Sequence, residues 1–358
     1  PVCMRSIIAR IVKFIQRKHV FFEVAAGGLL LVLALLALQS AWYSVLPIEG
    51  GVPILNEAEP NRRALDGMQV EEGLGYPPIV AVMVENMEEA QPISGLDQAS
   101  AVFESVMEAN ITRFLAFFTL GGVESSGKSS IGPVRSARPY FLDWVREFDA
   151  LYAHVGSSPE ADALIKQGAV RDLDQWFQSQ YFWRDTSRPR PHNVYTSLEL
   201  LKRAADKKTI TETKIEAWKF KNDAALEQRG TAEAIAVGYA EPYRVVWKYD
   251  RERNAYAREQ WGGPHRMTDG AALRPKNIVV AWLPMKVLDE VGRKWFGTIG
   301  SGEAVVFRDG EAIRGTWRKS AREERMRFFD DKGLEVVFNA GQMWIEIVPE
   351  GMKVEFEV

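Results

Sequence analysis

Cysteine is almost absent from this chain, which has one, Cys3, among 358 residues. A single thiol excludes an intramolecular disulfide and a cluster of thiolate metal ligands, so packing must stabilise the fold. Charge of one sign is not in excess either, because 45 Lys and Arg stand against 48 Asp and Glu. Without a basic field that attracts a polyanion, nucleic acid is not predicted as a partner.

Sequence patterns of common catalytic sites are also missing. No serine lies in a G-x-S-x-G elbow, which argues against a hydrolase that uses such a nucleophile. None of the 4 histidines has the H-E-x-x-H spacing of a zinc site, and neither a metal nor a cofactor is predicted. These absences argue against an enzyme but do not exclude one.

One long apolar run lies near the N-terminus and predicts a transmembrane helix over 20–46, since about 20 such residues span a bilayer. The segment 1–19 is basic, whereas no Lys or Arg follows the run until Arg62, which predicts a cytoplasmic N-terminus. A cleavable signal peptide is the alternative. The chain is therefore expected in the cell membrane as a single-pass protein with an extracytoplasmic soluble body.

The rest of the chain divides by composition and periodicity. Residues 47–76 are rich in Pro, Gly and Glu and predict a linker. Strand patterns over 77–86, 101–107 and 112–120 interleave with helix patterns over 137–149 and 198–208. They predict an α/β domain over 77–210 with a mixed sheet and helices. After a connector over 211–229, short alternating runs with glycine turns over 230–358 predict a mainly β domain.

The soluble part contains the long motifs IGPVRSARPYF, HVGSSPEA, FWRD and RPHNVYTS, and later KNIVVAWLP and NAGQMWIEIVP. In this order they resemble the YerB-like lipoprotein family, a domain-of-unknown-function family of bacterial envelope proteins. The resemblance covers 77–358 and implies an envelope location, but it brings no established activity. The lipobox that many relatives carry is replaced here by the predicted transmembrane helix, and Cys3 precedes that helix, so lipidation is not predicted.

Three arginines are the main candidates for a binding site: Arg113, Arg135 and Arg138. Arg135 and Arg138 lie three residues apart at a predicted helix start, so both guanidinium groups can project to one side. Guanidinium forks bind carboxylate or phosphate oxygens in pairs. The alternative is that the arginines pair with Glu104, Glu108 or Asp185 and only tie strands together.

A predicted strand end lies beside these arginines in the motif HVGSSPEA. Ser157 follows His154 by three residues and lies at a predicted helix N-terminus. The free amides and the dipole of a helix N-terminus favour an anion. Ser157 and Glu160 have the spacing of a capping box. Ser157 is therefore added to the predicted ligand-binding residues.

Two histidines and the FWRD motif supply further candidates. His154 and His192 are candidate proton donors or acceptors near neutral pH, and Asp185 is a third catalytic candidate; each has a structural role as its alternative. FWRD is either a surface that stacks on a saccharide, with Arg184 as a ligand-binding residue, or ordinary core beside an Arg184–Asp185 ion pair.

The segment Gly122–Ser129 satisfies the phosphate-loop pattern. A true phosphate loop runs straight into a helix, whereas Gly132-Pro133 interrupts the chain here. The segment is therefore predicted to be a loop that connects strands.

Two functional hypotheses follow. The first is a binding or scaffold protein, in which an arginine-lined cleft holds an anionic cell-wall fragment or polymer and the mainly β domain contacts envelope protein partners. The second is a phosphotransferase on lipid-linked polymers, similar in layout to the LytR-CpsA-Psr family. Such an enzyme needs acidic metal ligands that face the arginines, for which Glu104, Glu108 and Asp185 are available.

Overall fold

The computed structural model describes residues 61–121, 130–232 and 234–356. The predicted basic segment, the transmembrane helix and the linker up to residue 60 lie outside these residues, as does the phosphate-loop-like segment Gly122–Ser129. In the part of the chain that is described, no helix is long and apolar enough to cross a membrane.

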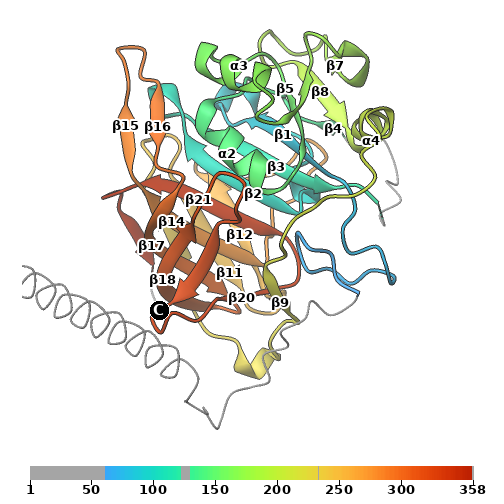
Figure 1. The fold of residues 1–358 in the computed structure, drawn as a ribbon. Helices are drawn as coiled ribbons and strands as arrows, with labels where there is room; N and C mark the ends of the chain where they lie inside the picture. Colours follow the sequence, from blue (N-terminus) through green and yellow to red (C-terminus); the bar gives the residue numbers. More distant parts are fainter. Residues whose placement is uncertain (1–60, 122–129, 233, 357–358) are drawn as a thin grey trace, which may run out of the picture. The chain divides into compact units, whose positions relative to one another are not determined.

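Ten of the described strands form one mixed sheet (Figure 1). They are β1 (Ile79–Glu85), β2 (Ala101–Val106), β3 (Thr112–Thr119), β5 (Leu151–His154), β6 (Arg171–Asp174), β14 (Asn277–Leu283), β17 (Gly300–Arg308), β18 (Glu311–Lys319), β19 (Arg327–Asp330) and β21 (Met343–Pro349). Their order across the sheet is β19-β18-β17-β14-β21-β2-β3-β1-β5-β6. The apolar runs that predicted β1, β2 and β3 are buried strands at its centre.

A second sheet of five described strands packs beside the first: β13 (Gly263–Pro264), β12 (Ala255–Gln260), β11 (Val245–Asp250), β10 (Ala234–Val237) and β22 (Val354–Phe356). The remaining short strands are β4 (Ser130–Ile131), β7 (Trp183–Arg184), β8 (Val194–Ser197), β9 (Lys219–Lys221), β15 (Met285–Val287), β16 (Lys294–Phe296) and β20 (Val337–Asn339). Strands β15 and β16 form a hairpin that projects at the upper left of Figure 1.

The large sheet is covered on both faces. Helix α2 (Pro139–Glu147) covers one face, where Trp144 stacks on Phe103 with ring centroids 5.5 Å apart. On the other face, Trp247 of β11 packs edge-on against Trp344 of β21 at 5.1 Å. Because alternate residues of a strand point to opposite faces, Phe103 and Glu104 lie in different layers. Helices α3 (Pro159–Lys166) and α4 (Leu198–Lys207) complete the region.

Strands from both predicted regions meet in the large sheet. Strand β21 pairs in parallel with β2 and with β14, so that Ala101 and Asn277 both lie opposite Met343. Backbone hydrogen bonds therefore join the α/β region to the mainly β region, and the described body is one compact unit. The coarse fold class, a sheet-rich fold with few helices, is confirmed. The division of the chain at a connector over 211–229 stays a prediction.

Helix α3 begins one residue later than the capping-box pattern predicted. Backbone pairing holds Ser157 beside Ala137, whose N–H donates to Gly156 O at 3.0 Å and whose carbonyl accepts from Ser158 N at 3.2 Å. The chain is therefore free to turn into a helix only at Ser158, whose Oγ accepts from Ala161 N at 3.3 Å.

Replacing the cap tests this assignment. Ser158→Ala is expected to lower the free energy of unfolding by about 1 kcal/mol, because one amide of the first helical turn loses its partner. Ser157→Ala is the matched control and is expected to change it by a few tenths of that amount. Urea unfolding of both variants is the measurement. Equal losses would contradict Ser158 as the cap.

Candidate functional site

The candidate site lies where parallel strands of the large sheet end. Strand β1 pairs in parallel with β5, and β5 with β6, so Glu85, His154 and Asp174 end at one edge. Strand β3 runs antiparallel to β1 and places Arg113 directly opposite Glu85. Ligands of open α/β sheets commonly bind outside this carboxyl edge.

A crossing segment brings two further arginines to the same edge. Val134 bridges Val84 of β1, Arg135 N donates to Met83 O at 2.8 Å, and Val155 N donates to Arg135 O at 3.0 Å. The segment thus fills the space between the ends of β1 and β5. We call Arg113, Arg135, Arg138, Glu85 and Glu108 the arginine cluster.

Glu85 is fully buried and has two partners on one oxygen. Arg135 Nε lies 2.7 Å from Glu85 Oε2, and His192 Nδ1 lies 2.9 Å from the same atom. Arg135 Nη1 also donates to Pro191 O at 3.1 Å. The other oxygen, Glu85 Oε1, has no hydrogen-bond partner among the residues that the structure describes.

Arg113 is a buried cation and is only 7% exposed. Its Nη1 donates to Ser136 O at 2.9 Å, while no described residue accepts a hydrogen bond from its Nε. Burial first, and then the charges of Arg138 and Arg135, together lower the pKa of Arg113 to about 10 against the opposing effect of Glu85. Folding therefore buries the charge of Arg113 and brings it near two like charges, and both effects are unfavourable for the charged guanidinium.

Arg138 binds Glu108 with two hydrogen bonds, Nε to Oε1 at 2.7 Å and Nη2 to Oε2 at 3.3 Å. Burial opposes ionisation of Glu108, but the hydrogen bond and charge of Arg138 outweigh it and keep the pKa of Glu108 below its ordinary value. The arginine cluster contains three guanidinium groups and two carboxyl groups, so its formal charges sum to +1.

His154 lies under this edge and is 1% exposed. Its Nδ1 is 2.8 Å from Gly156 O, its Nε2 is 2.7 Å from Asp172 Oδ1, and its ring stacks on Tyr152 with centroids 4.8 Å apart. Both ring nitrogens are held by oxygen atoms of the protein. This arrangement fits a structural role better than proton transfer to a ligand.

Glu104 does not face the arginines, which was one of the alternatives that the sequence left open. It lies on the opposite face of β2, where Arg258 Nη2 is 2.9 and 2.7 Å from its two carboxylate oxygens. The strand's alternation explains the difference, because Ser105, not Glu104, pairs with Arg113 across the β2–β3 ladder.

Arg184 and Asp185 do not form the predicted ion pair. Arg184 Nη1 donates to Asn193 Oδ1 at 2.9 Å and Nη2 to Gln175 Oε1 at 3.4 Å. Asp185 Oδ1 instead accepts from Ser187 N at 2.9 Å and Oγ at 2.6 Å, and these hydrogen bonds lower the pKa of Asp185. Successive residues point to opposite sides here, which separates the two side chains.

The sequence interpretation missed two features of this edge. Glu85 ends the apolar run of β1, and a carboxylate at a strand end was the available signal. Trp176 and Phe177 follow β6 and are 67% and 82% exposed. A Trp-Phe pair directly after a strand that ends in Asp174 was the corresponding signal for an exposed aromatic turn.

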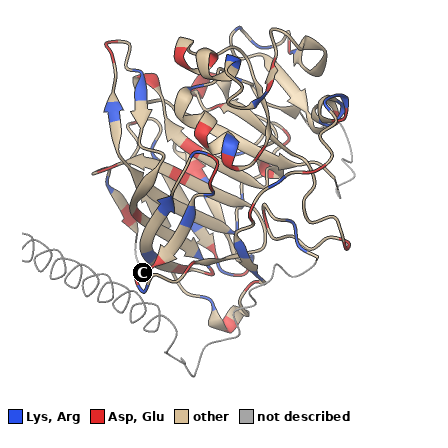
Figure 2. Cartoon of the chain, viewed as in Figure 1, with Lys and Arg blue, Asp and Glu red and all other residues tan. Residues whose placement is uncertain are grey.

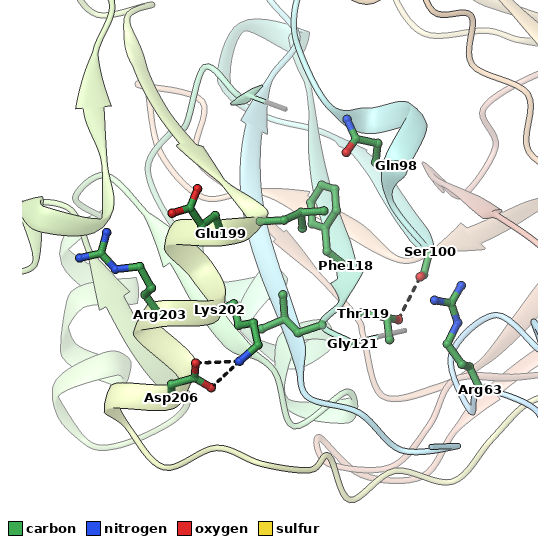
Figure 3. Close-up of a pocket in the computed structure, with 12 residues that line it drawn as sticks. Arg63, Gln98, Ser100, Phe118, Thr119, Gly121, Glu199, Lys202, Arg203 and Asp206 are labelled. Atoms are coloured by element: carbon green, nitrogen blue, oxygen red, sulfur yellow. Dashed lines mark hydrogen bonds and ion pairs between the residues drawn. The ribbon is translucent and has the colours of Figure 1, made fainter. Parts of the chain in front are cut away.

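A cavity of about 390 Å³ lies elsewhere, between the end of β3 and helix α4 (Figure 3). Lys202 pairs with Asp206 at 2.7 Å along its wall, and Ser100 contacts Thr119 at 3.0 Å. None of the predicted site residues lines this cavity. Within the described ranges, no three His, Cys, Asp or Glu side chains are grouped as metal ligands.

Charges of both signs are interspersed over the described body (Figure 2).

Comparisons with known proteins identify relatives along most of the chain. Residues 65–211 match the model of "Protein of unknown function (DUF3048) N-terminal domain", and residues 235–345 match its C-terminal domain. The chain is 32% identical to "Putative lipoprotein YerB" of Bacillus subtilis (strain 168) over 80% of this chain and 86% of that protein. The crystal structure of the YerB protein from Bacillus subtilis matches with a TM-score of 0.72 and 28% identity, over 83% of this chain and 99% of that one. The chain therefore belongs to the YerB-like (DUF3048) family that its sequence motifs predicted.

Proposed function

We propose that this protein works at the outer face of the cell membrane, where its arginine cluster binds an anionic group of a cell-wall fragment or polymer. The predicted N-terminal anchor and the lipoprotein name of its relative both support a body tethered to the outside of a membrane. Contact of the mainly β region with other envelope proteins stays a prediction.

The surplus guanidinium of Arg113 carries the binding proposal. Its pKa is lowered to about 10 by burial and by two neighbouring arginines, so an anion placed among them relieves repulsion. The side chains of Arg135 and Arg138 are each 19% exposed, so both are partly accessible at the surface. Phosphate and carboxylate are the anions that such forks bind best.

No observation favours the phosphotransferase alternative. It needs acidic side chains directed at the arginines as metal ligands, but Glu104 binds Arg258 and Asp185 binds Ser187. Glu108 does face Arg138, and its two oxygens are engaged by that guanidinium.

The variant Arg113→Gln tests the proposal. We expect it to weaken ligand binding at least about tenfold, because a charge-assisted hydrogen bond contributes about 1.5–3 kcal/mol. Its free energy of unfolding is expected to change by less than about 1 kcal/mol, because a desolvated and repelled cation is removed together with one hydrogen bond.

Melting temperature is measured for the full chain in mild detergent with teichoic-acid fragments, muropeptides and polyprenyl pyrophosphates. Arg171→Gln is the matched control, since Arg171 is an arginine at the opposite end of β6 that pairs with Asp149. At least one ligand should raise the melting temperature of wild type and of the control, but not of Arg113→Gln. The proposal fails if no ligand shifts wild type, or if the Arg113 variant responds equally.

A further inference from the structure

Two aromatic side chains stand exposed beside the arginine cluster. Among the large hydrophobic residues that the structure describes, Phe177 is the most exposed at 82%, followed by Trp176 and Val291, each at 67%. Single exposed apolar residues need no explanation, but two adjacent aromatic rings next to a charged site are the composition of a ligand-binding surface.

The turn that carries these rings is held by hydrogen bonds. Asp174 Oδ1 accepts from Gly156 N at 3.0 Å and from Trp176 N at 3.1 Å. Asp174 O accepts from Phe177 N at 3.1 Å and from Gln178 N at 3.0 Å. These hydrogen bonds fix the backbone that carries both rings before a ligand arrives, which lowers the entropy cost of binding.

The indole of Trp176 lies against Gly156. A Cβ at Gly156, whose φ is +65°, would lie 3.2 Å from Trp176 Nε1. The carbonyl of Gly156 accepts from Ala137 N at 3.0 Å, and Ala137 sits between Ser136, which binds Arg113, and Arg138. The aromatic turn and the arginine cluster therefore rest on the same strand ends.

Polar groups connect the two features on another side. Arg184 bridges Gln175 Oε1, beside Trp176, to Asn193 Oδ1 at 2.9 Å. The neighbour of Asn193, His192, contacts Glu85 of the arginine cluster at 2.9 Å. Hydrogen bonds therefore run from the residue before Trp176 to Asn193, the sequence neighbour of His192, so the aromatic turn and the arginine cluster are linked through polar side chains.

We propose that Trp176 and Phe177 form a stacking platform for a sugar ring, and that the ligand class of this protein is an anionic saccharide. The C–H face of a pyranose ring packs on an aromatic face, while its hydroxyl groups reach polar neighbours such as Arg184. The phosphate or carboxylate of the same ligand binds the arginine cluster. This inference rests on the proposed function and adds the sugar to it.

Calorimetric titration of the full chain in mild detergent tests the platform with two matched pairs of probes. N-acetylglucosamine 1-phosphate is compared with inorganic phosphate, and glucuronate with acetate. In at least one pair, wild type should bind the sugar-bearing anion about three- to tenfold more tightly than the simple anion. The double variant Trp176→Ala/Phe177→Ala should lose this difference and keep the affinity for the simple anion.

Two controls accompany the titration. Trp295→Ala removes a half-exposed Trp of the β15–β16 hairpin and should bind like wild type. Trp176→Tyr keeps an aromatic ring and should retain most of the preference.

Equal affinity for both members of each pair in wild type, or an unchanged preference in the double variant, overturns the platform and leaves the anion site standing. Binding of none of the four probes by wild type contradicts the anion site and the platform together.

Discussion

Arg258→Met is expected to lower the free energy of unfolding by about 3–5 kcal/mol, the cost of leaving a buried charge unpaired. The side chains of Arg258 and Glu104 are both fully buried between the two sheets. Nη2 of Arg258 contacts both carboxylate oxygens of Glu104, and Nη1 donates to Gln260 Oε1 at 2.6 Å. The guanidinium carbon also lies 5.3 Å from the ring centre of Trp344.

A second buried acid lies beside this pair. Glu346 of β21 lies directly opposite Glu104 of β2 in the parallel ladder and is fully buried as well. Without Arg258, the buried charge of Glu104 loses the cation that contacts both of its oxygens. Urea unfolding is the measurement, and Lys248→Met is the control, because the Lys248–Glu259 pair is largely exposed.

The double variant Glu104→Gln/Arg258→Met should recover most of the loss, since it removes both buried charges at once. If Arg258→Met unfolds at the same urea concentration as Lys248→Met, the buried pair does not stabilise the fold in the way described.

The second large effect is a dependence of stability on pH through Glu346. Burial, and then the charge of Glu104, raise the pKa of Glu346 from 4.5 to about 8. The folded protein therefore keeps a proton that the unfolded chain releases. Between pH 4.5 and 8, folding takes up this proton, and the free energy of unfolding falls as pH rises, by at most about 1.4 kcal/mol per pH unit.

Glu346→Gln mimics the protonated acid and isolates this effect. His265 changes stability in the opposite direction, because burial and the charge of Arg258 push its pKa well below 6.5. Its contribution to the free energy of unfolding therefore increases as pH rises and is complete above pH 6.5. The difference between wild type and Glu346→Gln cancels this contribution. The free energy of unfolding, measured at several pH values from 5 to 8, should fall in wild type relative to Glu346→Gln as pH rises. Parallel pH profiles of the two proteins would show that Glu346 is already ionised in the folded state.

Local patterns in the sequence predicted the strands and helices but not how distant ones pair. The apolar runs of β1 and β3 and the amphipathic helix α4 are where periodicity placed them. The cap of α3 was missed by one residue, because the pairing of Ala137 around Ser157 involves a segment that is not adjacent in the chain. Pairing between strands far apart in sequence leaves no local signal.

The same limit applies to the site. Sequence spacing singled out Arg113, Arg135 and Arg138, and the structure places them within reach of one another's charge. Glu85 was missed although His192, its partner 107 residues later, was chosen. The partner of Glu104 could not be predicted, because Arg258 lies 154 residues away in the sequence.

The position of β21 has a consequence for the order in which the chain folds. Trp344 of β21 contacts Glu104 of β2 across 240 residues of sequence. During synthesis from the N-terminus, the edge of β2 that pairs with β21 therefore stays unpaired until almost the whole described body has been made. Loops of this length slow folding, and an open edge recruits other strands. A chain cut short before β21 is consequently expected to aggregate rather than to form a native half, because the strand that joins the two regions of the large sheet is missing.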